Sequence, residues 1–288
     1  MLTDVRGKKY NRKPMMAIVI LGSFVGVLSE TFLNNALATI MNYFQVTQAS
    51  AQWLSTAFQL VMGLMIPMSA WVFNNFTSLT NYRWMLTTFL VASLICSLAP
   101  SFEILLAGRL LQAIAAGALM PFVQNVILSL FPPQKRGLAM GLTGLVIAFG
   151  PALGPTLAGL ILKYFNWRIL FVIPGILVAL ALMTTFIYPR ILNHVHHTHF
   201  DFLSLIWSTI GFGSLLYSFS EIGNTGRLNL LEIVMLLIGI IFIAIFGIRQ
   251  LHLKAPIINL VIFKNWVFNL STTLSMLGNF AMIGMELI

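Results

Sequence analysis

One apolar stretch of the sequence, residues 141–159, has the length of a helix but an unusual density of glycine and proline. So many of these residues would badly weaken a helix in water. A membrane helix tolerates them, because hydrocarbon offers the backbone no other hydrogen-bond partner and neighbouring helices support the bends. Gly150 and Gly154 lie on one helical face, where small residues allow a second helix to approach closely. The residues concerned are Gly141, Gly144, Gly150, Pro151, Gly154, Pro155 and Gly159.

The composition indicates that lipid surrounds most of the chain. It is 59% hydrophobic and only 8% charged, and a water-soluble domain has too little interior to bury that much apolar surface. A formal charge of +9 would suggest nucleic-acid binding in a soluble protein. Here the basic residues fall in short loops between apolar runs, which is typical of membrane proteins, so we expect no nucleic-acid partner.

Several classes of chemistry find no support in the sequence. Cys96 is the single cysteine, so neither an internal disulfide nor a cysteine metal site can form. There is no phosphate-cradling glycine–lysine loop and no nucleophile–base pairing. We therefore expect a protein that is not an enzyme and that uses no bound cofactor.

About twenty apolar residues cross a bilayer as a helix, and runs of this kind predict eight full spans and a ninth that is cut off at Ile288. We expect either a fragment or a truncated gene, because the final residues have mid-helix character. Lysine and arginine lie mostly on the side of the N-terminus, which predicts a cytoplasmic N-terminus in a multi-pass plasma-membrane protein. The predicted spans are 15–40, 51–73, 83–100, 104–130, 137–162, 168–188, 203–220, 229–249 and 267–288.

Glu30 is an acidic residue in the middle of the first predicted span. A carboxylate is costly in hydrocarbon, so it should face a cavity or protein, where it could carry a proton or bind a cationic substrate. Thr31, Asn34 and Asn35 form a polar stripe with it. The alternative is that these side chains only hydrogen-bond neighbouring helices together.

Arg109 is a lone arginine in the fourth predicted span, and Gln112 lies one turn further on the same side. An arginine at this depth needs a partner or an aqueous face, so it is a second candidate for the transport site. The alternative is an interfacial arginine that extends to the outer surface, because Glu103 marks the helix start nearby.

The tract at residues 194–200, HVHHTHF, contains four histidines that could bind a metal. No cysteine accompanies them, and Asp201 is the only nearby acidic residue. We interpret the tract as a solvated cytoplasmic loop and predict no metal site.

Three of these patterns resemble the major facilitator superfamily, and in particular its EmrB/QacA-type fourteen-span drug:proton antiporters. The glycines and prolines of 141–159 are similar to the antiporter motif of the fifth helix, with Ala158 at a position usually held by glycine. The stretch around Glu30 resembles the first-helix signature, and Arg109 with Gln112 resembles the motif of the fourth helix. The loop after the second span lacks the family's acidic gating residue, a feature shared with a lincomycin-resistance-like subgroup.

The resemblance implies an all-α integral membrane protein with the major facilitator fold. It also implies proton-coupled export of small lipophilic, often cationic compounds by a protein that is a monomer when full length. An inactive remnant, or an exporter of a metabolite or siderophore, are the alternatives. The implied organisation is a basic N-terminus (1–14), a six-helix bundle (15–188), a cytoplasmic connector (189–202), two inserted helices (203–249), and a connector with the truncated start of the second half (250–288).

Overall fold

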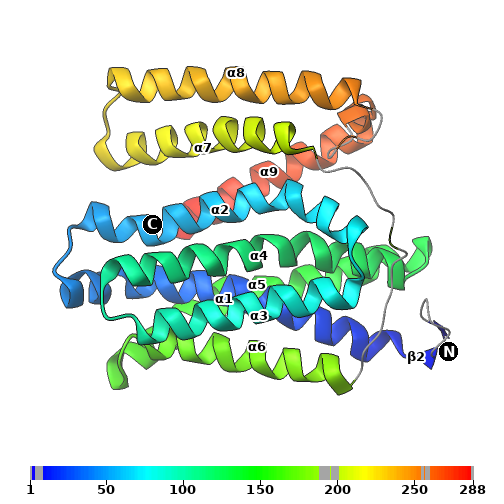
Figure 1. Cartoon of the computed structure of the whole chain (residues 1–288), viewed down its shortest axis with the longest axis horizontal. Coiled ribbons are helices and arrows are strands. Elements are labelled where there is room, and N and C mark those ends of the chain that lie inside the picture. The colour runs from blue at the N-terminus through cyan, green and yellow to red at the C-terminus, as the bar shows by residue number, and fades with distance from the viewer. Residues whose placement is uncertain are drawn as a thin grey trace.

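The chain is almost entirely helical. The computed structural model describes residues 2–3, 9–187, 195, 201–253, 256 and 260–286, and Figure 1 shows their arrangement. Two short antiparallel strands, β1 (Leu2–Thr3) and β2 (Lys9–Tyr10), precede the helices. The helices are α1 (Arg12–Phe44), α2 (Gln48–Asn75), α3 (Ser78–Leu98), α4 (Phe102–Leu130), α5 (Pro133–Tyr164), α6 (Ile169–Ile187), α7 (Phe202–Thr225), α8 (Leu230–His252), the 3-10 helix η1 (Leu260–Lys264) and α9 (Trp266–Glu286).

Local sequence signals fix the helix boundaries. Hydroxyl side chains cap three helices, because the oxygens of Thr47, Thr77 and Ser101 accept hydrogen bonds from the first free backbone N–H groups. Pro133 starts α5, where its missing N–H costs nothing. Gly226 ends α7 with φ +63°, a left-handed conformation that glycine adopts without strain. Short connections then follow, as antiparallel neighbours require.

By length and composition, seven described helices can cross a membrane: α1, α2, α4, α5, α6, α7 and α8. The all-α membrane fold expected from the sequence is therefore confirmed. The predicted count was larger, because it included α3 and α9. Helix α3 begins with a polar segment, yet it packs along α4 and α6 as a member of the bundle.

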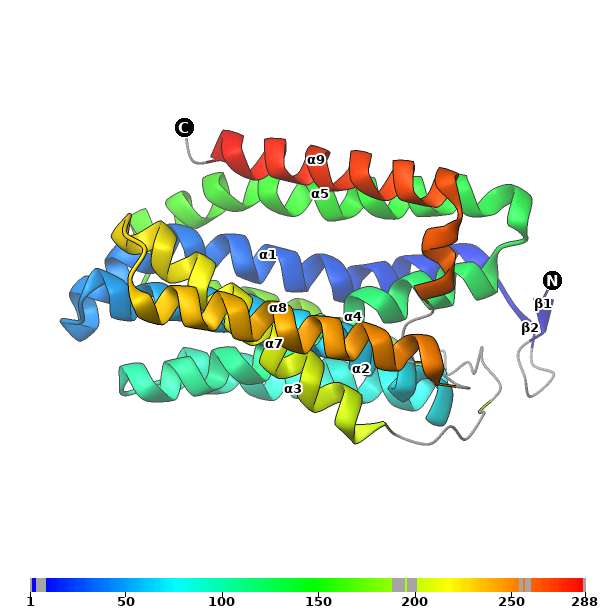
Figure 2. The ribbon, with the colours of Figure 1, turned by 90° about the horizontal axis from the view of Figure 1, so that it is seen from above.

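Helices α1 to α6 pack into one bundle, with α4 at its centre (Figure 1). Contacts of α4 with α1, α2 and α3 bury a large apolar cluster, and a second cluster joins α1, α3, α4 and α6 near the other end. Helix α5 lies against α1 and is exposed over much of its remaining surface (Figure 2).

Helices α7 and α8 form a separate hairpin that packs against α2 (Figure 1). Trp53 and Tyr217 stack across the contact with ring centroids 6.2 Å apart. The hydroxyls of Thr56 and Ser220 lie 3.4 Å apart. The hairpin therefore adds to the bundle at one helix, and its removal would leave the core of α1 to α6 intact.

Candidate functional site

Arg109 lies at the centre of the bundle and is fully buried. Its Nη1 donates to Ser29 Oγ at 3.2 Å and to Gln112 Oε1 at 2.8 Å. Its guanidinium lies 4.0 Å from the ring centroid of Phe58, within the range of a cation–π interaction. The interfacial alternative is therefore wrong, because the packed helices leave the Arg109 side chain with no solvent exposure.

Gln112 extends this network to a third helix. Its Nε2 donates to Ser93 Oγ on α3 at 2.9 Å, and its own side chain is also fully buried. Gln112, which the sequence places on the same side of α4 as Arg109, bonds to it directly. Sequence reasoning did not find Ser29, Ser93 or Phe58, because such residues are common in membrane helices and only the packing brings them to Arg109.

The charge of Arg109 has no carboxylate in contact with it. Between described residues, the one salt bridge joins Arg249 to Asp201 in the hairpin. Arg109 Nε and Nη2 are shielded from solvent and have no hydrogen-bond partner in the described part of the chain. A guanidinium offers five donors, so Arg109 holds unused donors beside neutral oxygen acceptors, at a depth where charge is costly.

Glu30 and Asn34 connect α1 to α2 on another side of α1. Glu30 is partly exposed, and its Oε1 accepts a hydrogen bond from Gln59 Nε2 at 2.9 Å. One turn further, Asn34 Oδ1 accepts a hydrogen bond from Ser55 Oγ at 2.8 Å. Two residues of the polar stripe predicted on α1, Glu30 and Asn34, therefore meet polar side chains of α2. The other two do not, because Thr31 faces α5 and Asn35 donates to the Thr31 carbonyl oxygen of its own helix.

Glu30 follows Ser29 directly, so the two candidate charges are linked through adjacent residues of α1. Ser29 is buried and bonded to Arg109, whereas the Glu30 carboxyl bonds to Gln59. Arg109 of α4 thus contacts α1 at the residue next to Glu30, and the two charged side chains form no ion pair with each other. Either charge can then change its environment without first breaking a salt bridge.

Gly150 and Gly154 are the points where α5 approaches α1. A Cβ at Gly150 would lie 3.0 Å from Val27 Cγ1, and a Cβ at Gly154 would lie 2.7 Å from Thr31 Cβ. Close packing at these glycines is therefore confirmed. Helix α5 uses these glycines to reach α1, the helix that carries Glu30.

Gly141, Pro155 and Gly159 of the motif lie away from this contact, whereas Ala158 is buried one turn after Gly154. A Cβ at Gly141 or Gly159 would meet nothing within 4 Å, and Pro155 is exposed. Packing within the described chain thus explains the need for a small residue at Gly150 and Gly154, but not at Gly141 or Gly159. Both Pro151 and Pro155 are accommodated inside a continuous α5.

The described residues contain no group of three or more side chains able to hold a metal ion. The histidine tract at 194–200 lies outside the described residues except for Val195, so its interpretation as a solvated loop stays a prediction.

Comparisons with known proteins agree on one family. Residues 19–286 match the Major Facilitator Superfamily. The chain is 40% identical to the Uncharacterized MFS-type transporter YcnB of Bacillus subtilis (all of this chain, 61% of that protein). It is 39% identical to the Lincomycin resistance protein LmrB of the same organism (92% of this chain, 56% of that protein). The chain therefore spans less than two thirds of the length of these relatives.

Solved structures support the same fold. The human organic anion transporter MFSD10 (TETRAN) aligns with a TM-score of 0.58 over 84% of this chain and 72% of that one. The identity between the two is only 14%, so this likeness concerns the fold alone.

Proposed function

The chain belongs to the Major Facilitator Superfamily, and on that basis we propose that it serves proton-coupled export of lipophilic compounds from the cell. The observation that carries the proposal is a membrane carboxylate, Glu30, next in the chain to the serine that binds a fully buried arginine, Arg109. Ionisable groups inside membrane helices mark proton or substrate pathways. The similarity to a protein named for lincomycin resistance supports a drug substrate.

In this proposal, Glu30 binds the transported proton and Arg109 sets the electrostatic environment around it. Gln59 donates a hydrogen bond to the carboxyl oxygen of Glu30 and can do so in either protonation state. A cationic substrate would compete with the proton for the same carboxylate. The proton gradient then drives the exchange, and no cofactor is required.

Export itself requires a conformational change. In secondary transporters of this type, two structural repeats rock around a site near the middle of the membrane. Helices α1 to α6 would form one repeat, with α7 and α8 as the inserted pair, the predicted domain organisation. The protein would sit in the plasma membrane with its N-terminus in the cytoplasm, the orientation predicted from the lysine and arginine bias.

The test is drug efflux from cells that express the protein, with and without a proton gradient. We expect Glu30→Gln to abolish gradient-driven efflux of lincomycin or a lipophilic cation, because glutamine cannot exchange a proton. Glu103→Gln is the matched control, since it makes the same change at an exposed acid in the first turn of α4.

Full gradient-driven efflux in Glu30→Gln, at wild-type expression, would contradict the role of Glu30. If the unsubstituted protein moves no drug in either condition, the drug substrate is wrong. A screen of metabolites and siderophores would then separate an exporter of other compounds from a protein without transport activity.

A further inference from the structure

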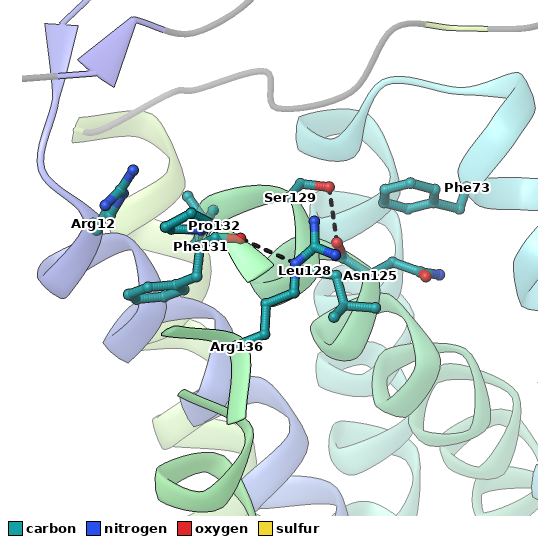
Figure 3. Close-up of a pocket in the computed structure, with 9 residues that line it drawn as sticks. Arg12, Phe73, Asn125, Leu128, Ser129, Phe131, Pro132 and Arg136 are labelled. Atoms are coloured by element: carbon teal, nitrogen blue, oxygen red, sulfur yellow. Dashed lines mark hydrogen bonds between the residues drawn. The ribbon is translucent and has the colours of Figure 1, made fainter. Parts of the chain in front are cut away.

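A cavity of about 530 Å³ lies at the end of the bundle where the chain begins (Figure 3). Helix α1 starts here, α2 and α4 end here, and α5 starts here. Arg12 reaches the cavity from α1 and Arg136 from α5. The cavity is therefore built from four helices of the bundle at the level where spanning helices meet water.

The two arginines carry positive charge that no acidic side chain among the described residues balances at this site. Among the described residues both arginines contact Phe131: the guanidinium of Arg12 lies 5.7 Å from the Phe131 ring centroid, and Arg136 Nε donates to the Phe131 carbonyl oxygen at 3.1 Å. None of the residues that line the cavity is acidic, and the described residues show no ion pair for either arginine. Arg12 Nε is also shielded and lacks a hydrogen-bond partner among them.

Guanidinium groups with free N–H donors match the oxygens of a phosphate group. The remaining walls fit a lipid: Phe73 and Leu128 supply apolar surface. The Ser129 hydroxyl donates to the Asn125 carbonyl oxygen at 2.9 Å, so the arginines are the charged donors left for a headgroup. Basic pockets between spanning helices at the membrane surface are a known kind of site for anionic headgroups.

We propose that this cavity binds the phosphate headgroup of an anionic phospholipid, with Arg12 and Arg136 as its ligands. The lipid would then link the start of α1 to the start of α5 at the membrane surface. These are the two helices that meet again at Gly150 and Gly154 deeper in the membrane. The inference does not depend on which compound the protein transports.

The experiment measures lipid binding to the purified, delipidated chain in neutral detergent by native mass spectrometry. The chain is titrated with phosphatidylglycerol, with zwitterionic phosphatidylcholine, and with two soluble sources of phosphate, inorganic phosphate and glycerol 1-phosphate. We compare Arg12→Gln and Arg136→Gln with Lys163→Gln, which removes an equal charge from the opposite end of α5. Circular dichroism checks that each variant retains its helices.

We expect phosphatidylglycerol to bind more tightly than phosphatidylcholine, and each arginine variant to weaken that binding about fivefold, the effect of one basic residue near an anionic membrane surface. Lys163→Gln should bind like the wild type. If an arginine variant loses its helices, the salt dependence of lipid binding by the wild type tests the proposal instead. High salt screens the attraction between the arginines and the headgroup, so it should remove the preference for phosphatidylglycerol.

Two results would overturn the proposal. One is equal binding of both lipids by the wild type, or unchanged binding of phosphatidylglycerol by folded arginine variants. The other is binding of inorganic phosphate or glycerol 1-phosphate as tight as that of phosphatidylglycerol, which would show a site for soluble phosphate in place of a lipid.

Discussion

Two hydrogen-bond networks in this protein each contain an arginine, and they surround its charge in opposite ways. In the bundle, Arg109 is fully buried and bonds only to neutral oxygens. In the hairpin, the Arg249 side chain is 32% exposed and forms a two-point contact with Asp201, with N–O distances of 3.0 and 3.1 Å. Both networks also contain a serine and a glutamine. They differ because only Arg249 contacts a carboxylate and only Arg109 is fully buried.

This comparison suggests different roles for the two arginines: Arg249 joins two helices of the hairpin, and we propose that Arg109 serves transport. Arg249 and Asp201 join the start of α7 to the end of α8, with Ser204 and Gln250 bonded to each other beside them. Removing a charge from such a partly exposed pair costs little stability. Arg109 has no ion-pair partner among the described residues. Its buried charge supports the proposed role in transport, because ionisable residues inside membrane helices mark substrate and proton pathways.

The largest expected effect comes from neutralising the two arginines in turn. Arg109→Gln should reduce transport by about tenfold or more, a change that corresponds to ~1.4 kcal/mol or more, because it removes the charge next to the Glu30 segment. Arg249→Gln should leave transport nearly unchanged. Efflux rates normalised to the amount of folded protein measure the difference. If Arg109→Gln and Arg249→Gln lose the same fraction of efflux, the two arginines do not differ in their importance for transport.

A smaller effect is expected from the glycines that let α5 approach α1. Gly154→Leu would drive a side chain into Thr31, and overpacking of this kind costs about 1–3 kcal/mol. Gly159→Leu is the matched control on the same helix, because nothing lies within 4 Å of the added Cβ. Thermal unfolding in detergent and efflux should both separate the two variants. If Gly154→Leu unfolds and exports as Gly159→Leu does, contact between α1 and α5 at this point is not required.

The smallest effect concerns the pH dependence of the hairpin. Burial raises the pKa of the Asp201 carboxyl. The hydrogen bonds from Arg249 and Ser204, together with the charge of Arg249, lower this pKa by more than burial raises it, so the net pKa lies below its ordinary value. Because the pKa is lower in the folded state, the stabilisation is present above the unfolded pKa of about 3.9 and is lost as pH falls through the folded pKa.

Asp201→Asn should therefore lower the stability of the chain by about 1 kcal/mol or less at neutral pH. The difference from the wild type should shrink as the pH falls below about 4. Unfolding curves recorded across this range provide the measurement. A difference that stays constant down to the lowest pH would mean that the ionised carboxylate contributes nothing.

The sequence by itself predicted the class of protein and the positions of its helices. Apolar runs of spanning length act locally, so nine helices could be placed without knowing how they pack. The same holds for Glu30 and Arg109, because a charge inside an apolar run is visible as a pattern. The pairing of Arg109 with Gln112 was also predictable, since the two residues are one turn apart on one helix.

Only the tertiary structure decided which helices these residues meet. The partners of Arg109 on α1 and α2, the partner of Gln112 on α3, and the contact of Gly154 with Thr31 all join residues far apart in the sequence. Serine, phenylalanine and glycine are too common in membrane helices to reveal such contacts. The cavity between Arg12 and Arg136 is also a product of packing, because it requires the ends of four helices at one level. Helices form from hydrogen bonds within a few residues of each other, whereas sites form from helices that the chain brings together only after it has folded.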